Sequence, residues 1–346
     1  MARILCAVNG GMGDQVLTLP AIRYLFSALP GHNLEIRIGG WKLRAPLLRT
    51  LLGVPLPIRS LDGLRHKSPK LRRSIQYDWI LDFDFRDPDT LEALPIWVIP
   101  KQGYFSFPKR NPRKNQITFP LRDENGPAFW QLCFSMAYRL DCTIDHHDFS
   151  SKTLKSIREN YRVLSLKPPS SKIQKRVQSL LSTAGNTGRH LAITPGGYNP
   201  IHKLWPAERF VEVICHSLSR GVNVFVLGSQ RESPLSWKIF QMISSKPESW
   251  KKNATGNLSF LTGKVTLQEL PYLLQKMNLH LSNDNGVAHI AGAINLPQIV
   301  LHRGATSSHV SLGRKDVLMF SGDNFDMKPI STESVIRSLD QQLEIR

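Results

Sequence analysis

The sequence predicts an α/β protein made of two doubly wound domains, each a parallel sheet flanked by helices. Short apolar runs alternate with helical patterns in both halves of the chain, which is typical of parallel sheets with crossover helices. The length of 346 residues suits two domains. A stretch with two prolines and two serines at 166–172 separates the two series and is the best linker candidate. We therefore expect domains at 1–165 and 173–330, followed by a helical segment at 331–346.

The first domain opens with an apolar strand at 4–8 that runs into a glycine turn. Asp14 opens the helix that follows, and its apolar residues recur at helical spacing until Pro30 and Gly31 end it. Further strands are expected at 34–38 and 77–83. Strands and helices joined by such short connections indicate crossover units of a parallel sheet.

The second domain repeats this pattern. Strands are expected at 191–194, 222–227, 279–282 and 298–301, and helices at 207–220, 267–276 and 287–294. The segment 331–346 is expected to be helical because its apolar residues lie at helical spacing: Val335, Ile336, Leu339 and Leu343. Ligands of doubly wound sheets bind beyond the carboxyl ends of the strands, so the residues that follow each strand are the functional candidates.

The net charge favours anionic partners. Lys and Arg number 45 against 27 Asp and Glu, a formal net charge of +18 that is spread over both halves. Such a field attracts nucleic acids, phosphorylated small molecules and anionic membrane surfaces, without choosing among them.

The sequence does not indicate disulfide bonds, a membrane span, a known nucleotide-binding loop or a metal site. The four cysteines are scattered without a C-x-x-C pair, so we expect free thiols in a reducing compartment. No apolar run approaches the ~18 residues of a membrane span, and we expect a cytoplasmic protein that is at most peripheral to a membrane. The chain lacks a P-loop, and the turn at 10–13 lacks the third glycine of a dinucleotide fingerprint. His146, His147 and Asp148 are expected in a solvated loop, so no metal site is expected.

Two glycine turns with a charged residue nearby are candidate sites. Gly11 and Gly13 precede Asp14, whose carboxylate could accept a proton from a bound hydroxyl or could simply cap its helix. Gly196 and Gly197 follow a strand, and Lys203 comes shortly after them. That lysine could meet a phosphate or could be one more surface cation.

Two further candidates follow later strands of the second domain. Glu232 lies four residues after a strand-ending glycine, where a carboxylate can accept ribose hydroxyls or can merely occupy the first turn of a helix. Asp284, Asn285 and Gly286 join a strand to a helix whose free N–H groups would suit a pyrophosphate. His289 lies one turn inside that helix and could face the ligand.

In their order along the chain, these motifs resemble glycosyltransferase family 9, the heptosyltransferases. The matching segments are Gly11-Met12-Gly13-Asp14 to Pro20, Thr194 to Gly197, Lys203 to Pro206, Leu227 to Glu232, Leu261 to Leu267 and Asn283 to His289. The similarity spans about residues 1 to 312, with a less family-like stretch between about Leu56 and Lys172. Two departures are Asn285, where many members carry Thr or Ser, and 301–306 in place of a Phe-Gly-x-Thr motif.

The resemblance implies a GT-B fold, in which two Rossmann-like domains face each other across a central cleft. It implies an inverting, metal-independent transfer of a heptose-like sugar from a nucleotide-diphosphate donor, such as ADP-heptose, to a glycan or lipid-linked acceptor such as lipopolysaccharide core. The donor would bind the C-terminal domain and the acceptor the N-terminal domain, with the terminal helix packing back on the N-terminal domain. No other cofactor is implied.

The same resemblance implies a role for each candidate residue. Asp14 would be the general base on the acceptor hydroxyl. Lys203 and the helix that starts at Asn285 and Gly286 would stabilise the departing pyrophosphate. Glu232 would hold the ribose, while Asp284 would position donor hydroxyls or the phosphate-binding loop.

Two alternatives stay open. A catalytically silent relative would only bind a nucleotide sugar. A nucleic-acid-binding protein is suggested by basic stretches at 65–73 and 101–114, the second interleaved with Tyr104, Phe105 and Phe107. These stretches would equally hold a phosphorylated glycan or an anionic lipid, and nucleic acid is not expected because no recognition motif accompanies them.

Overall fold

The computed structural model divides the chain into two compact units, Met1–Lys167 and Pro168–Arg346. The structure describes residues 1–61, 76–84, 100–107, 115–119, 129–184, 188–197, 204–302, 312, 316–320 and 327–344.

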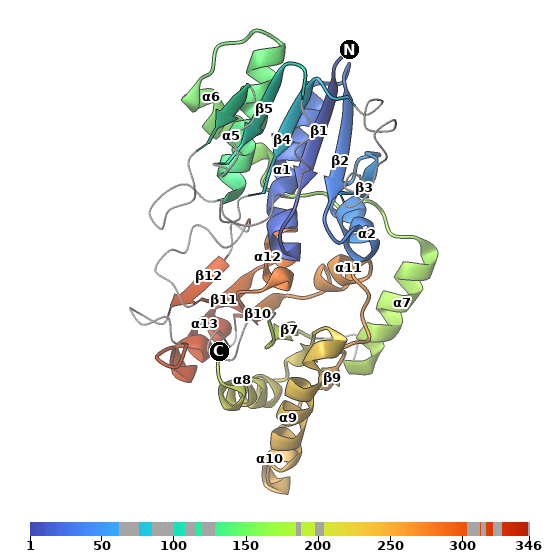
Figure 1. Ribbon diagram of the computed structural model, residues 1–346. Coiled ribbons are helices and arrows are strands. Elements are labelled where there is room, and N and C mark those ends of the chain that lie inside the picture. The colour runs from blue at the N-terminus through green and yellow to red at the C-terminus, as the bar shows by residue number, and fades with distance from the viewer. Residues whose placement is uncertain are drawn as a thin grey trace. The chain divides into compact units, whose positions relative to one another are not determined.

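The first unit is a parallel sheet with helices packed on it (Figure 1). Its sheet has six strands in the order β3-β2-β1-β4-β5-β6, and all neighbouring pairs are parallel. Its elements are β1 (Arg3–Val8), α1 (Met12–Ala28), β2 (Asn33–Ile38), α2 (Trp41–Leu52), β3 (Ile58–Ser60), β4 (Trp79–Asp82), β5 (Gly103–Ser106), β6 (Gln116–Thr118), α5 (Phe129–Ile144) and α6 (Ser151–Tyr161).

Burial on both faces explains why β1 reads as a continuous apolar run. Every residue of β1 after Arg3 is buried, as expected for a central strand of a parallel sheet. Helix α1 packs on α5, and its Tyr24 contacts the ring of Phe134. The Tyr24 hydroxyl donates to the buried carboxylate of Asp141, so this polar tip is satisfied inside the helix layer. Burial raises the pKa of Asp141 above its usual range.

The second unit repeats the topology of the first. Its sheet has the order β12-β11-β10-β7-β8-β9, again parallel throughout. Its elements are α7 (Ser171–Leu181), η1 (Ser182–Ala184), β7 (His190–Thr194), α8 (Ala207–Ser219), β8 (Asn223–Val226), η3 (Gln230–Glu232), α9 (Ser233–Ser244), α10 (Glu248–Asn253), β9 (Leu258–Phe260), α11 (Leu270–Leu274), β10 (Leu279–Asn283), α12 (Gly286–Ala293), β11 (Gln298–His302), β12 (Asp316–Phe320) and α13 (Thr332–Gln342).

The terminal helix α13 belongs to the core of the second unit. Val335, Leu339 and Leu343 are buried in the same apolar cluster as α8 and β7. Trp205 of that cluster donates its indole N–H to the carbonyl of Ile330, 2.9 Å away, which fixes the chain just before α13. The resemblance implied that 331–346 packs on the first domain. Within the second unit, the apolar stripe of α13 is covered by α8 and β11. Packing of this segment on the first domain stays a prediction.

The predicted fold class of two doubly wound parallel sheets is confirmed, with shifts at element boundaries. Helix α11 covers only Leu270–Leu274 of the expected 267–276. The aromatic residues of the second basic stretch are core residues of the first unit: Tyr104, Phe105 and Phe107 are fully buried. They therefore cannot stack on nucleic-acid bases, so the nucleic-acid-binding alternative loses its aromatic contacts and depends on charge alone.

Within the described residues, no helix combines the length and apolarity needed to cross a bilayer.

We predict that Leu339→Ala destabilises the second unit by about 2–5 kcal/mol, because it removes a fully buried side chain and leaves a cavity. Arg337→Ala, on the exposed side of α13, should stay within about 0.5 kcal/mol of wild type. Urea unfolding of the full chain followed by tryptophan fluorescence measures both. Equal stability of the two variants would contradict the placement of α13.

Candidate donor site at the switch point of the second sheet

The topology of the second unit brings two polar loops together. The strand order reverses between β7 and β10, which are adjacent in the sheet although nearly 90 residues separate them in sequence. A doubly wound sheet binds its ligands at such a reversal, beyond the carboxyl ends of the strands. The glycines 196 and 197 follow β7, and Asp284 and Asn285 follow β10. These sequence-predicted residues therefore lie at the position where this fold binds ligands.

Two asparagine side chains tie these loops to each other. The buried Asn283 donates from Nδ2 to the carbonyl of Pro195 at 2.6 Å and accepts the N–H of Trp205 at 3.1 Å. Asn285 donates from Nδ2 to the carbonyls of Gly196 at 2.9 Å and Thr194 at 3.4 Å. Three consecutive carbonyls at the end of β7 are thus satisfied by side chains at the end of β10 and the start of α12, which holds the backbone in one conformation.

Asn285 also caps α12. Its Oδ1 accepts the backbone N–H groups of Val287 at 2.9 Å and Ala288 at 3.2 Å. A capped helix start retains further amide groups and the positive end of the helix dipole, so it suits an anion. Gly286 is the first residue of this helix. Asn285 therefore acts as a structural bridge, a role that the sequence did not distinguish from direct ligand contact.

Glu232 reaches from the β8 loop to the β7 loop. Its Oε2 accepts the backbone N–H of Ser229 at 2.5 Å, so Glu232 caps the short helix η3. This agrees with the expected alternative of a glutamate in the first turn of a helix. The same carboxylate lies against two glycines: a Cβ on Gly196 would fall 1.9 Å from its Oε1, and one on Gly228 would fall 3.3 Å from its Oε2. Glu232 is therefore held at the strand ends by backbone that only glycine leaves open.

Asp284 lies between two histidines. One carboxylate oxygen is 3.7 Å from Nε2 of His289, and the other is 3.4 Å from Nε2 of His302. Both rings are mostly buried, while the Asp284 side chain is 40 % exposed. Protonation of either ring would create an ion pair with Asp284. His302 was not predicted as a site residue; its place directly after an apolar strand that neighbours β10 is the signal that could have identified it.

A buried histidine supports this arrangement from inside the sheet. His280 on β10 is fully buried; its Nε2 lies 2.9 Å from the hydroxyl of Thr194, and its Nδ1 lies 3.4 Å from Oε1 of Gln298. Because Oε1 can only accept, Nδ1 donates, and in a neutral ring Nε2 then accepts the hydroxyl of Thr194. Burial lowers the pKa of His280 to about 4.

In the first unit, Asp14 caps its own helix. Its Oδ2 accepts the N–H of Gly11 at 2.7 Å, at the third position of α1. Gly10 has a φ of +93°, and a Cβ there would fall 2.7 Å from the same oxygen, so the turn requires glycine. Gly13 is the second residue of α1. Arg44 of α2 donates to the carbonyl of Gly10 at 2.7 Å and closes the turn from the other side.

A pair of buried carboxylates beside this turn was missed by the sequence analysis. Asp82 is the last residue of β4, which is next to β1 at the reversal of the first sheet, and Asp84 follows two residues later. Asp82 accepts the Tyr104 hydroxyl and the N–H of Asp84, so its carboxylate fixes the end of this strand. Two acidic residues directly after an apolar strand were the available signal.

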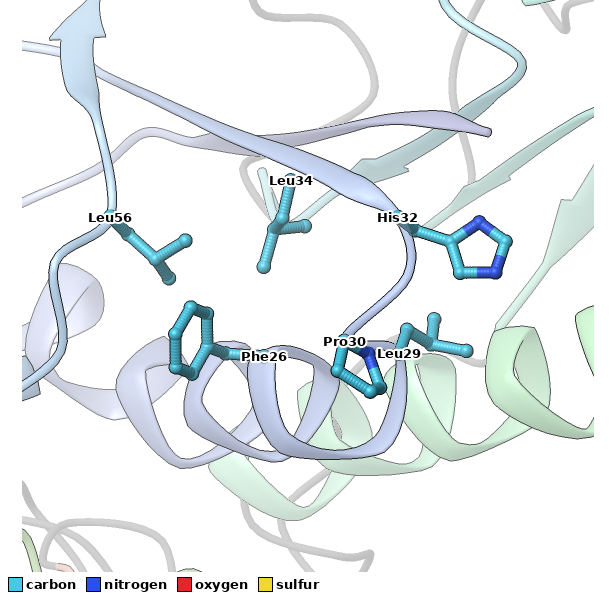
Figure 2. Close-up of a pocket in the computed structure, with 6 residues that line it drawn as sticks. All are labelled: Phe26, Leu29, Pro30, His32, Leu34 and Leu56. Atoms are coloured by element: carbon cyan, nitrogen blue, oxygen red, sulfur yellow. The ribbon is translucent and has the colours of Figure 1, made fainter. Parts of the chain in front are cut away.

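An apolar pocket of about 160 Å³ also occurs in the first unit, at the opposite end of its sheet (Figure 2). Six residues from the end of α1, the start of β2 and the segment before β3 line it: Phe26, Leu29, Pro30, His32, Leu34 and Leu56. The pocket lies away from the strand ends where the polar candidates gather, so it is not part of either candidate site.

Some predicted residues lie outside the described part of the chain. Lys203 is among them, as are 65–73 and 108–114 of the basic stretches. Among the described residues, no group of three or more His, Cys, Asp or Glu could hold a metal ion.

A sequence model described as "Glycosyltransferase family 9 (heptosyltransferase)" matches residues 154–334. The lipooligosaccharide heptosyltransferase 2 of Haemophilus influenzae is 29% identical over 306 residues, which cover 86% of this chain and 81% of that protein. The lipopolysaccharide heptosyltransferase 2 of Salmonella typhimurium is 23% identical over 112 residues, 32% of this chain and only 30% of that protein.

Solved structures share the fold over nearly the whole chain. A family 9 glycosyltransferase from Veillonella parvula superposes with a TM-score of 0.71 at 14% identity, covering 99% of this chain and 97% of that one. The ADP-heptose lipopolysaccharide heptosyltransferase II of Escherichia coli gives 0.68 at 16% identity, with 99% and 98% coverage. The iron-containing dodecameric glycosyltransferase TibC of enterotoxigenic E. coli gives 0.55 at 13% identity, with 99% and 76% coverage.

We predict that His280 makes stability fall as the pH drops from about 6.5 to about 4. In this window the unfolded chain binds a proton that the folded chain excludes, so up to about 3 kcal/mol is lost. His280→Gln should flatten this part of the pH profile, whereas His147→Gln, at an exposed position, should not. Urea titrations between pH 7.5 and 4, at roughly half-unit steps, measure this. An unchanged slope in His280→Gln would refute the assignment.

Proposed function

The chain belongs to glycosyltransferase family 9, and from this premise we propose that it transfers a heptose from ADP-heptose to an acceptor of the lipopolysaccharide core, inverting the anomeric centre. The observation that carries the proposal is the cluster at the switch point of the second sheet. It combines a capped helix start, an adjacent glycine loop and a carboxylate held at the strand ends. These are the parts that a nucleotide diphosphate needs.

The donor would bind with its diphosphate at the start of α12 and its ribose at Glu232. Backbone N–H groups at the helix start neutralise phosphate charge without a side-chain cation. The carboxylate of Glu232 can accept hydrogen bonds from two ribose hydroxyls, as acidic residues do in related nucleotide sites. Adenine and heptose are proposed on the basis of the structural relative from E. coli that carries ADP-heptose in its name.

Departure of the nucleotide leaves negative charge on the diphosphate. We assign its stabilisation to the amides of α12 and to Lys203, which follows the β7 loop in sequence. Asp284 would orient His289 and His302 beside this charge, because its two oxygens face the two rings. In this scheme amides and side-chain cations do the work of a metal ion, so transfer should persist in EDTA.

Asp14 would take the proton of the acceptor hydroxyl as general base. Its hydrogen bond to the Gly11 N–H occupies one carboxylate oxygen and fixes the side chain, and a carboxylate has a second oxygen that can accept a proton. Capping and catalysis are therefore compatible roles of one residue. The acceptor is proposed to be a lipid-linked, anionic glycan reached from the cytoplasmic face of a membrane.

The direct test is to incubate the protein with ADP-heptose and heptose-deficient lipopolysaccharide core, with and without EDTA. Mass spectrometry should show one added heptose and released ADP under both conditions. Binding of ADP-heptose without transfer of its heptose would support the alternative of a silent nucleotide-sugar-binding protein. Loss of transfer in EDTA, restored by a metal, would refute the metal-independent mechanism.

We predict that Gly196→Ala weakens ADP binding about 10- to 100-fold while the protein still folds. The new Cβ would overlap Oε1 of Glu232 and displace the carboxylate from the strand ends. A hydrogen bond to a charged group contributes about 1.5–3 kcal/mol, which sets this range. Gly31→Ala is the matched control, because a Cβ there meets nothing within 4 Å.

Isothermal titration with ADP measures both glycine variants, together with Glu232→Ala and the Gly196→Ala/Glu232→Ala double variant. If Gly196 acts through Glu232, the double variant should be no weaker than Glu232→Ala alone. Additive losses would show that Gly196 acts in another way.

We predict that Asp14→Asn lowers transfer about 10²–10⁴-fold, the usual contribution of general-base catalysis. The amide oxygen of asparagine can still accept the Gly11 N–H from this third helical position, so thermal stability and ADP affinity should stay close to wild type. Steady-state kinetics, a melting curve and ADP titration measure the three quantities. Turnover near the wild-type rate would leave Asp14 as a helix cap only.

A further inference from the structure

Helix α9 presents two large aromatic side chains to solvent. Trp237 is 58% exposed and Phe240 is 41% exposed, and their rings stack with centroids 5.2 Å apart and an interplanar angle of 23°. Among the described residues they are the only exposed large hydrophobic side chains of the second unit, since Met1, Ile117 and Phe149 belong to the first. We call Trp237 and Phe240 the aromatic pair.

The aromatic pair is held in place from the core side of its helix. Ile239 and Ile243 anchor α9 in the apolar core of the unit. The ring of Phe240 packs edge-on against Phe260 of the edge strand β9, at a centroid distance of 5.7 Å. Trp237 in turn stacks on Phe240. The pair is therefore a fixed feature of the surface at this edge of the sheet.

The segment that carries the aromatic pair is basic. Residues 231–253 contain Arg231 and four lysines against two glutamates. Two of the lysines are paired, Lys238 with Glu208 and Lys251 with Glu248, both at 2.7 Å. Exposed Arg231 and Lys252 form no ion pair with any described residue. The aromatic pair thus sits in a segment of positive charge on a protein that carries +18 overall.

We propose that this surface docks on an anionic lipid bilayer. Aromatic side chains partition into the interface between headgroups and acyl chains, and neighbouring cations attract anionic lipids. A membrane requires an exposed apolar group and cations on the same segment, and the aromatic pair and the basic residues of 231–253 meet this requirement. A second copy of this chain is disfavoured as the occupant, because the basic segments of the two copies would repel each other.

Neither residue of the aromatic pair belongs to the candidate donor site. Docking can therefore be tested without acceptor, donor or turnover, and its outcome is independent of the proposed transferase activity. If the acceptor is lipid-linked as proposed, docking would keep the enzyme at the surface that holds its substrate.

Co-sedimentation of the full-length protein with acceptor-free vesicles tests the proposal. We expect binding to vesicles that combine phosphatidylcholine with roughly one-third phosphatidylglycerol, a composition that supplies the negative surface potential. Binding should weaken in vesicles of phosphatidylcholine alone and in high salt. Trp237→Ser/Phe240→Ser should weaken it at least tenfold, and Lys252→Ala about fivefold. Absence of binding to anionic vesicles would overturn the proposal.

Phe149→Ser is the matched control, because Phe149 is 39% exposed and packs on another aromatic ring, Tyr138, in the first unit. It should bind vesicles like wild type; a loss equal to that of the double variant would overturn the assignment of the surface. Melting curves identify any variant that loses its fold. If the double variant unfolds, Trp237→Ser alone replaces it in the vesicle assay, because this variant keeps the contact between Phe240 and Phe260.

The depth to which Trp237 enters the bilayer is measured by fluorescence quenching with brominated lipids. Wild type should lose tryptophan fluorescence on vesicles that contain them, and Trp237→Phe should lose far less. Quenching that is unchanged in Trp237→Phe would show that another surface enters the bilayer. Sedimentation velocity completes the test: self-association that depends on Trp237, without vesicle binding, would identify a second copy as the occupant and refute the membrane.

Discussion

The hydrogen bonds from Asn283 and Asn285 to the β7 loop are the constraint on which the candidate donor site depends. Three consecutive carbonyls at the end of β7 accept hydrogen bonds from two side-chain amides, one on β10 and one at the start of α12. The same Asn285 caps α12, so the position of the loop and the start of the helix are set by one side chain. Rigid backbone at a ligand site reduces the ordering that binding would otherwise require.

A second constraint is steric. Glu232 can lie at the end of β7 because Gly196 has no Cβ in its way, and Gly228 leaves it further room. The hydrogen bond from the Ser229 N–H holds the carboxylate in this position. The buried His280, whose pKa is lowered by burial, contacts the hydroxyl of Thr194 and so supports this end of β7 from inside the sheet.

The two units share one sheet topology but differ in the polar contacts at the reversal of the strand order. Both sheets reverse their strand order at the centre, and in both a glycine turn and a carboxylate lie at that reversal. In the first unit Asp14 accepts an N–H of its own turn, and Asp82 accepts an N–H of its own loop together with the Tyr104 hydroxyl of β5. In the second, the side chains of Asn285 and Glu232 link different loops, which builds a surface from segments that are far apart in the sequence.

The sequence by itself determined the fold class and the identity of most candidate residues, because apolar periodicity and glycine turns are local signals. It placed the glycines 196 and 197, Glu232, Asp284 and Asn285 after strands. Only the tertiary structure decided that β7 and β10 are neighbours, so that Asn285 bridges two loops and Asp284 meets His302. It also decided that α13 completes the second core and that the aromatics of the second basic stretch are buried. Strand order and side-chain burial depend on contacts between distant segments, and no local pattern encodes these contacts.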